Sequence, residues 1–84
     1  MYYKLDKDNK PVECSIQESQ VGHHISMNRF GNIYVSTVFL GIEHYSGMFE
    51  TMIFDDPKLN NYQERYETFK EAIEGHNRLI KKYE

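Results

Sequence analysis

Two neighbouring runs of hydrophobic and β-branched residues dominate the middle of the chain. They span residues 33–42 and 48–54, and the connection between them begins at Gly41 and ends at Gly47. β-Branched and aromatic residues favour strands, and glycine favours turns. The pattern therefore predicts a central β-hairpin with strands at about 33–42 and 48–54.

Hydrophobic residues of the first run occupy both sides of the expected strand. They are Ile33, Val35 and Phe39 on one side, and Val38, Leu40 and Ile42 on the other. A strand with one face in water would alternate more strictly between apolar and polar residues. We therefore predict that the hairpin lies inside a sheet with a covering layer on each face.

The C-terminal segment has the pattern of an amphipathic helix. Thr68 and Glu71 form a capping box, and hydrophobic residues then recur at helical spacing, which predicts a helix at about 69–83. Gly75 costs about 1 kcal/mol relative to Ala inside a helix, so we expect another part of the chain to approach the backbone there. His76 lies on the apolar side, which predicts a partly buried ring with one nitrogen hydrogen-bonded.

Shorter elements complete the predicted fold. We expect strands at 2–5, 23–27 and 62–66, a helical turn or two starting at the Ser15–Glu18 capping box and ending at Gly22, and turns or loops at 6–11, 28–32 and 55–61. The prediction is a single α+β domain, residues 1–84, with an antiparallel sheet of four or five strands and the helix on one face. The other face must be covered by residues 12–22, by a second copy or by a partner.

Composition limits the classes of function. The single cysteine, Cys14, cannot form a disulfide within the chain, which fits a reducing cytoplasm. No stretch of 18 apolar residues is present, so we expect no membrane association. A formal net charge of −3 disfavours a nucleic-acid partner, because phosphate contacts require clustered Lys and Arg.

The histidines do not have the spacing of a metal site. His23 and His24 are adjacent, so they point to opposite sides of a strand, and Cys14 stands alone. We therefore predict no metal and no other cofactor.

A catalytic site could be assembled only from scattered residues. Ser36 or Thr37, with His44 and Glu50, provides the residue types for a nucleophile, a base and an orienting group. The sequence contains no nucleophile elbow or phosphate-binding loop, and a domain of this size offers no deep pocket. We predict that the protein is not an enzyme, and the alternative is a small hydrolytic enzyme that uses His44 and Glu50.

Charged residues within the predicted sheet suggest a binding patch. A carboxylate cannot be buried unpaired without a cost of several kcal/mol, so Glu50 must face water or meet a cation, and Arg65 on the next strand is the natural partner. One interpretation is an ordinary surface ion pair. The other is a polar patch that recognises a ligand. The candidate binding residues are Ser36, Thr37, Glu50, Glu64 and Arg65 on the sheet, with His44 in the hairpin loop.

Half of the chain resembles a known family of small proteins. The resemblance is carried by the segments Val-Ser-Thr-Val-Phe-Leu-Gly-Ile-Glu-His at 35–44, Met-Phe-Glu-Thr-Met-Ile-Phe at 48–54 and Tyr-Gln-Glu-Arg-Tyr at 62–66, and by Thr68, Glu71, Ala72, Gly75 and His76. The family is found across bacteriophage and prophage genomes, so the resemblance implies a phage origin and a host-cytoplasmic setting. It implies no activity, cofactor or catalytic residue. Family members often have a Trp-containing start and a longer loop before residue 48, and residues 1–32 lie outside the resemblance.

Together these observations favour a non-enzymatic binding protein of the host cytoplasm. Its partner would be a host or phage protein, for example a defence protein that it modulates. The alternative is a homo-oligomer that binds a small ligand or nucleotide, with Arg65 at the subunit boundary.

Overall fold

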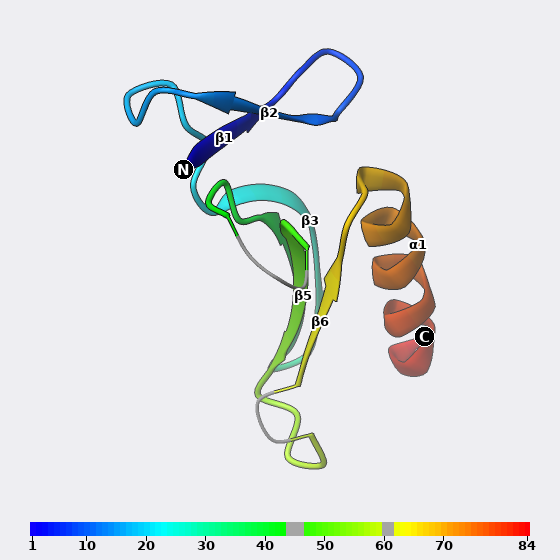
Figure 1. The fold of residues 1–84 in the computed structure, drawn as a ribbon. Helices are drawn as coiled ribbons and strands as arrows, with labels where there is room; N and C mark the ends of the chain where they lie inside the picture. Colours follow the sequence, from blue (N-terminus) through cyan, green and yellow to red (C-terminus); the bar gives the residue numbers. More distant parts are fainter. Residues whose placement is uncertain (44–46, 60–61) are drawn as a thin grey trace.

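A four-stranded antiparallel sheet with one helix forms the body of the molecule in the computed structural model, which describes residues 1–43, 47–59 and 62–84 (Figure 1). The sheet order is β3 (His23–Phe30), β4 (Ile33–Phe39), β5 (Phe49–Phe54) and β6 (Gln63–Tyr66). Helix α1 (Phe69–Ile80) lies on one side of this sheet and ends in a 3₁₀ turn, η1 (Lys81–Tyr83). Strands β1 (Tyr2–Leu5) and β2 (Pro11–Cys14) form a separate two-stranded sheet. The α+β prediction is confirmed.

The central hairpin forms as predicted, with a shorter first strand. Val35, Thr37 and Phe39 of β4 are fully buried against α1, and they pair with Ile53, Thr51 and Phe49 of β5. The strand ends at Phe39 instead of residue 42. Gly41 then takes a φ of 75°, and a Cβ at this position would lie 2.8 Å from the backbone of Gln20. Only glycine fits this close approach of the two segments.

The turn predicted at 28–32 is wrong, because β3 continues to Phe30. The turn consists of Gly31 and Asn32 alone, since Phe30 pairs directly with Ile33. Gly31 has a φ of 63°, and glycine at the first position is typical of a two-residue type II′ hairpin loop. The longer strand allows the Phe30 ring to stack on Tyr83, with the centroids 5.4 Å apart.

The helical turns predicted from residue 15 are also wrong, because residues 16–18 form an isolated turn after β2. Ser15 and Glu18 contact each other, but not as a capping box: the Ser15 hydroxyl donates to Glu18 Oε1 at 3.2 Å, and the Glu18 N–H donates at 3.1 Å to the Ser15 carbonyl, not to its side chain. No helix follows, because the chain reaches Gly22, with a φ of 69°, and enters β3. A Ser-x-x-Glu sequence permits a capping box but does not by itself supply the residues that continue a helix.

The N-terminal hairpin covers the end of the core, not the second face of the main sheet. Tyr3 and Leu5 of β1 pack against the cluster around Phe39, Phe49 and Tyr66, which lies on the helix side. Figure 1 shows β1 and β2 beyond the end of the four-stranded sheet. The prediction that residues 12–22 cover the other face is therefore not met, and the two other covers that we predicted, a second copy or a partner, remain.

The capping box of the C-terminal helix is confirmed. The Glu71 N–H donates to the Thr68 hydroxyl at 3.1 Å, and the Thr68 N–H donates to the Glu71 carboxylate at 3.1 Å. The predicted close approach at Gly75 is also present, because a Cβ there would lie 2.3 Å from the Tyr66 hydroxyl oxygen. The helix can therefore sit directly on β6.

Candidate functional site

The face of the sheet opposite α1 carries exposed hydrophobic side chains. We call it the open face and define it by Met27, Tyr34, Ser36, Val38, Met52 and Phe54, which strand pairing places on one side. Met27 is 55% exposed and Phe54 is 43% exposed. Figure 1 shows α1 on the other side of the sheet, and within the described residues no helix or strand lies over this face. An apolar surface of this kind is a feature of binding sites.

An ion pair lies at one end of the open face. Glu50 and Arg65 are directly opposite in β5 and β6, and Arg65 Nε donates to Glu50 Oε2 at 2.8 Å. The Glu50 side chain is only 9% exposed, and the Arg65 side chain is 27% exposed. The pair predicted from the sequence is confirmed. Because the two charges neutralise each other, this end of the face presents little net charge.

Arg29 lies at the other end, on the edge strand β3. Its guanidinium carbon lies 5.2 Å from the centroid of the Tyr34 ring, and its Nε donates to the Gly31 carbonyl at 2.8 Å. A cation over an aromatic face is attracted by about 0.5–1 kcal/mol at exposed sites. These contacts hold Arg29 and the Tyr34 ring together at the margin of the open face.

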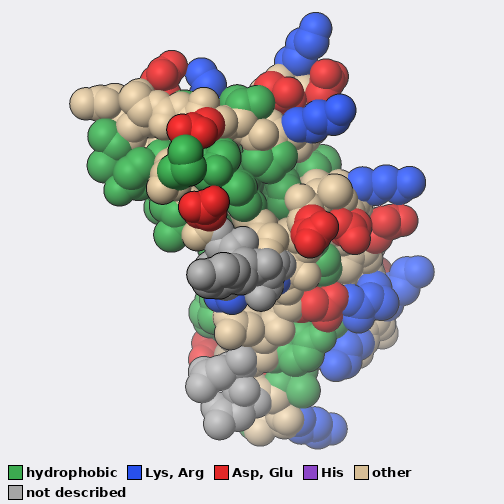
Figure 2. Space-filling model, viewed as in Figure 1, with side chains coloured by type: hydrophobic (Ala, Val, Ile, Leu, Met, Phe, Trp, Pro, Cys, Tyr) green, Lys and Arg blue, Asp and Glu red, His purple; other side chains and the backbone are tan. Residues whose placement is uncertain are grey.

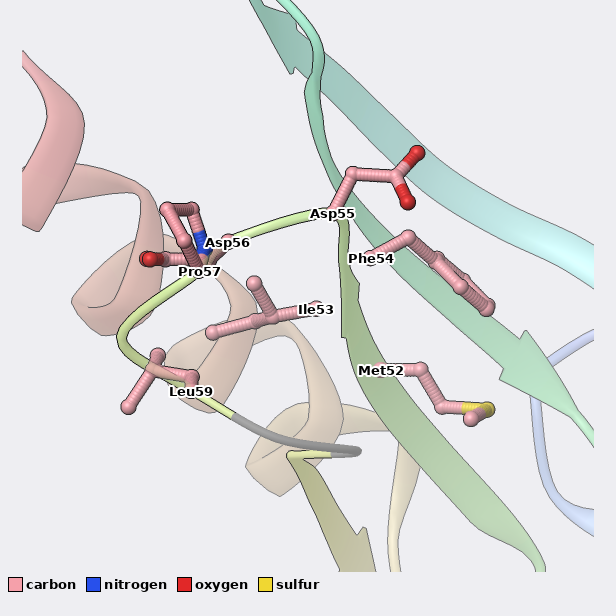
Figure 3. A pocket seen from close by; sticks show the side chains of 7 residues that line it. All are labelled: Met52, Ile53, Phe54, Asp55, Asp56, Pro57 and Leu59. Carbon is pink, nitrogen blue, oxygen red and sulfur yellow. The ribbon is translucent and has the colours of Figure 1, made fainter.

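A pocket of about 540 Å³ lies where β5 ends, and it is lined by Met52, Ile53, Phe54, Asp55, Asp56, Pro57 and Leu59. Figure 3 shows Met52 and Phe54 on one side of β5 and Ile53 on the other, toward α1. The Asp55 carboxylate lies on the same side as Phe54. The pocket thus adds an acidic group to the margin of the open face near Phe54.

The helix side of the sheet contains a buried series of hydrogen-bonded polar side chains instead of a binding surface. His76, which is 1% exposed, contacts the Asn28 Oδ1 at 2.8 Å through Nε2 and the Thr37 hydroxyl at 2.7 Å through Nδ1. An amide oxygen only accepts, so Nε2 carries the hydrogen and Nδ1 accepts from Thr37. Thr37 in turn accepts from the Thr51 hydroxyl, 2.5 Å away. Both nitrogens of the ring are bonded, where the sequence predicted one.

Burial determines the protonation states of the titratable side chains on this side of the sheet. It lowers the pKa of His76, because the charged imidazolium would have to be removed from water. Burial also raises the pKa of the Tyr66 phenol, and the Tyr66 hydroxyl has no hydrogen-bond partner among the described residues. With 1% exposure, the His76 ring is closed to solutes, so its contribution is structural.

The structure divides the predicted binding residues between the two faces. Ser36, Glu50 and Arg65 lie on the open face. Thr37 is buried under α1, and Glu64 faces the helix side, where it accepts from Tyr62 at 2.6 Å and from Arg78. The interpretation of one continuous polar patch is therefore wrong, because adjacent strand residues point to opposite faces. His44, on which the hydrolytic alternative also depends, lies outside the described residues.

The sequence predicted apolar residues, Val38 among them, on this side of the hairpin, but the predicted binding residues did not include them. Their signal was the two-residue period of β4, continued by pairing to Met27 on β3 and to Met52 and Phe54 on β5. Figure 2 shows Lys and Arg side chains along the helix side, and hydrophobic side chains gathered around the N-terminal hairpin. The hairpin side includes exposed Met1, Tyr2 and Ile16.

Residues 1–43, 47–59 and 62–84 contain neither a candidate metal cluster nor a candidate transmembrane helix. In this part of the chain, no three His, Cys, Asp or Glu side chains come together in a way that could hold a metal ion. None of its helices combines the length and the hydrophobicity that a bilayer crossing requires.

Comparison with protein-family models, with characterised proteins and with solved structures finds no match for this chain. The geometry of the open face is therefore the main indication of function.

Proposed function

We propose that this protein is a non-enzymatic binding protein that docks a protein partner on the open face of its sheet. The observation that carries the proposal is the exposure of Met27 and Phe54 on a face over which no described helix or strand lies. A small domain gains stability by burying every apolar surface that it has. Side chains of this size left in water are better explained by a partner than by the fold of one chain.

The composition of the face supports a protein partner. Its centre holds Met, Tyr, Phe and Val side chains, and charged groups stand at its margins. Protein interfaces have this arrangement of an apolar core with aromatic and Met side chains and a polar rim. The resemblance of residues 35–76 to small phage proteins extends the proposal to a partner in the cytoplasm of an infected bacterium, such as a host defence protein.

Methionine oxidation provides a direct test inside cells. Met1 is 62% exposed and Met27 is 55% exposed, so hydroxyl radicals should oxidise the two to a similar extent in dilute purified protein. In cells that make the protein, we expect Met27 to be protected while Met1, on the N-terminal hairpin, stays reactive. Equal oxidation of Met1 and Met27 in cells and in dilute solution would contradict the proposal.

A further inference from the structure

The area of the open face is close to what one partner contributes to a small protein interface. Four strands about 4.8 Å apart and six residues about 3.4 Å apart give a face of roughly 400 Å² in projection. Side-chain relief makes the accessible area larger than the projection, so it approaches the roughly 600–800 Å² per partner of small and standard interfaces. The whole molecule measures 38 × 21 × 20 Å, so the face spans most of its width.

The charges on this face are compatible with a copy of itself. A face with charges of one sign would repel an identical face. Here Glu50 is paired with Arg65, and the remaining charges, Arg29 and Asp55, have opposite signs. Arg29 lies on the β3 edge, whereas Asp55 directly follows β5 on the far side of β4.

A two-fold axis parallel to the strands brings these groups together. It superposes the β3 side of one sheet on the β6 side of the other, because the strand order is β3-β4-β5-β6. Tyr34 and Phe54, which are direct partners in β4 and β5, then lie over Phe54 and Tyr34 of the second copy. Arg29 approaches the side that carries Asp55 of the second copy. An axis perpendicular to the strands would instead place Tyr34 and Phe54 over the row that contains Glu50.

We infer that the partner of the open face is a second copy of this chain, and that the two sheets pack face to face as an eight-stranded sandwich. This inference rests on the proposed function, because it names the partner of the same site. Two antiparallel sheets packed in this way lie about 10 Å apart with their strands within about 30° of each other. Ser36 and its pairing partner Met52 lie at the centre of the contact.

The open face also has features of a sheet that stacks RNA bases, namely Tyr34, Phe54 and the neighbouring Arg29. The two arginines of the face are engaged within the chain, Arg65 with Glu50 and Arg29 with Tyr34 and Gly31. With a net charge of −3, the chain lacks the basic excess that phosphate contacts require. The observations therefore favour a second copy.

The test measures two quantities on the same purified protein, its self-association and the oxidation of Met27 relative to Met1. Sedimentation over a micromolar to millimolar range should show a monomer–dimer equilibrium, and protection of Met27 relative to Met1 should increase with the dimer fraction. Met52→Lys places a charge at the centre and should raise the dissociation constant at least about tenfold, as expected for a central interface residue. The matched control is Ile16→Lys, at a 58% exposed position on the N-terminal hairpin, which should leave the constant unchanged.

Circular dichroism checks that both variants remain folded, and the outcomes separate the two proposals. A protein that stays monomeric at millimolar concentration overturns the second-copy inference, while protection of Met27 in cells would still support the proposed function. A dimer disrupted by Ile16→Lys but not by Met52→Lys overturns the assigned face. If a single-stranded oligonucleotide protects Met27 and concentration alone does not, the partner is nucleic acid and both proposals fail.

Discussion

The buried hydrogen bonds that join the Thr51 and Thr37 hydroxyls to the His76 ring predict that two similar substitutions lower the free energy of unfolding by different amounts. Thr37→Val keeps the shape of the side chain and removes only the hydroxyl. It takes away the donor to Nδ1 of His76, at 2.7 Å, and the acceptor of the Thr51 hydroxyl, at 2.5 Å. Each buried polar group left without a partner costs about 1–3 kcal/mol, and the added methyl recovers about 1 kcal/mol. For the two groups together we expect a net loss of about 1–5 kcal/mol.

Thr51→Val is the matched comparison, because Thr51 is also fully buried. Thr51 is the first donor of the hydrogen-bonded series. Removing its hydroxyl therefore leaves only one lone pair on the Thr37 oxygen without a donor. We expect a cost of about 0–1 kcal/mol for this variant. Urea unfolding followed by circular dichroism at pH 7.5 gives both values, at one fixed protein concentration because association adds to apparent stability. If Thr51→Val costs as much as Thr37→Val, the donor order from Thr51 through Thr37 to His76 is incorrect.

Three further predictions concern the helix. Thr68→Ala removes the capping hydroxyl and should lower the free energy of unfolding by about 1 kcal/mol in urea titrations, with no loss meaning that the cap is dispensable. Gly75→Ala should lower the free energy of unfolding by about 1 kcal/mol, because overlap of the new methyl with Tyr66 costs more than the gain in helix propensity. The control Asn77→Ala, on the exposed side of the helix, should stabilise the protein. A stabilising Gly75→Ala would mean that the Tyr66 ring moves freely. Since burial lowers the pKa of His76 in the folded state, the unfolded state binds more protons below about pH 6.5. The free energy of unfolding should therefore fall as the pH drops, by up to about 1.4 kcal/mol per pH unit for this one group. If His76→Gln has the same dependence of stability on pH between pH 7 and pH 5, the acid sensitivity belongs to other groups.

Local patterns were sufficient for the elements whose sequence and packing agree. The capping box at Thr68 is followed by a continuous apolar side, so the helix could be predicted from residue 69. The same motif at Ser15 is not followed by such a side, and the chain turns into β3. The strand end at Phe30 was signalled by the Gly31–Asn32 dipeptide, which is typical of a two-residue hairpin loop.

The division of the site between two faces was also present in the sequence, but only as strand periodicity. Ser36 and Thr37 are adjacent and therefore point in opposite directions, so they could not share one patch with Glu50 and Glu64. The placement of the N-terminal hairpin could not be predicted in this way. It depends on long-range contacts, such as the Tyr3 N–H donating to the Gly41 carbonyl at 2.8 Å, which leave no periodic signal.

In the proposed dimer, the open face is buried by a second copy of the chain. Isotope-filtered nuclear Overhauser measurements on a mixture of labelled and unlabelled protein test it most directly, because they detect only contacts between copies. The expected signals join the Met52 methyl group and the Tyr34 and Phe54 rings of one copy to the open face of the other. Signals between copies that involve only the N-terminal hairpin or α1, or no such signals at millimolar concentration, would contradict the claim.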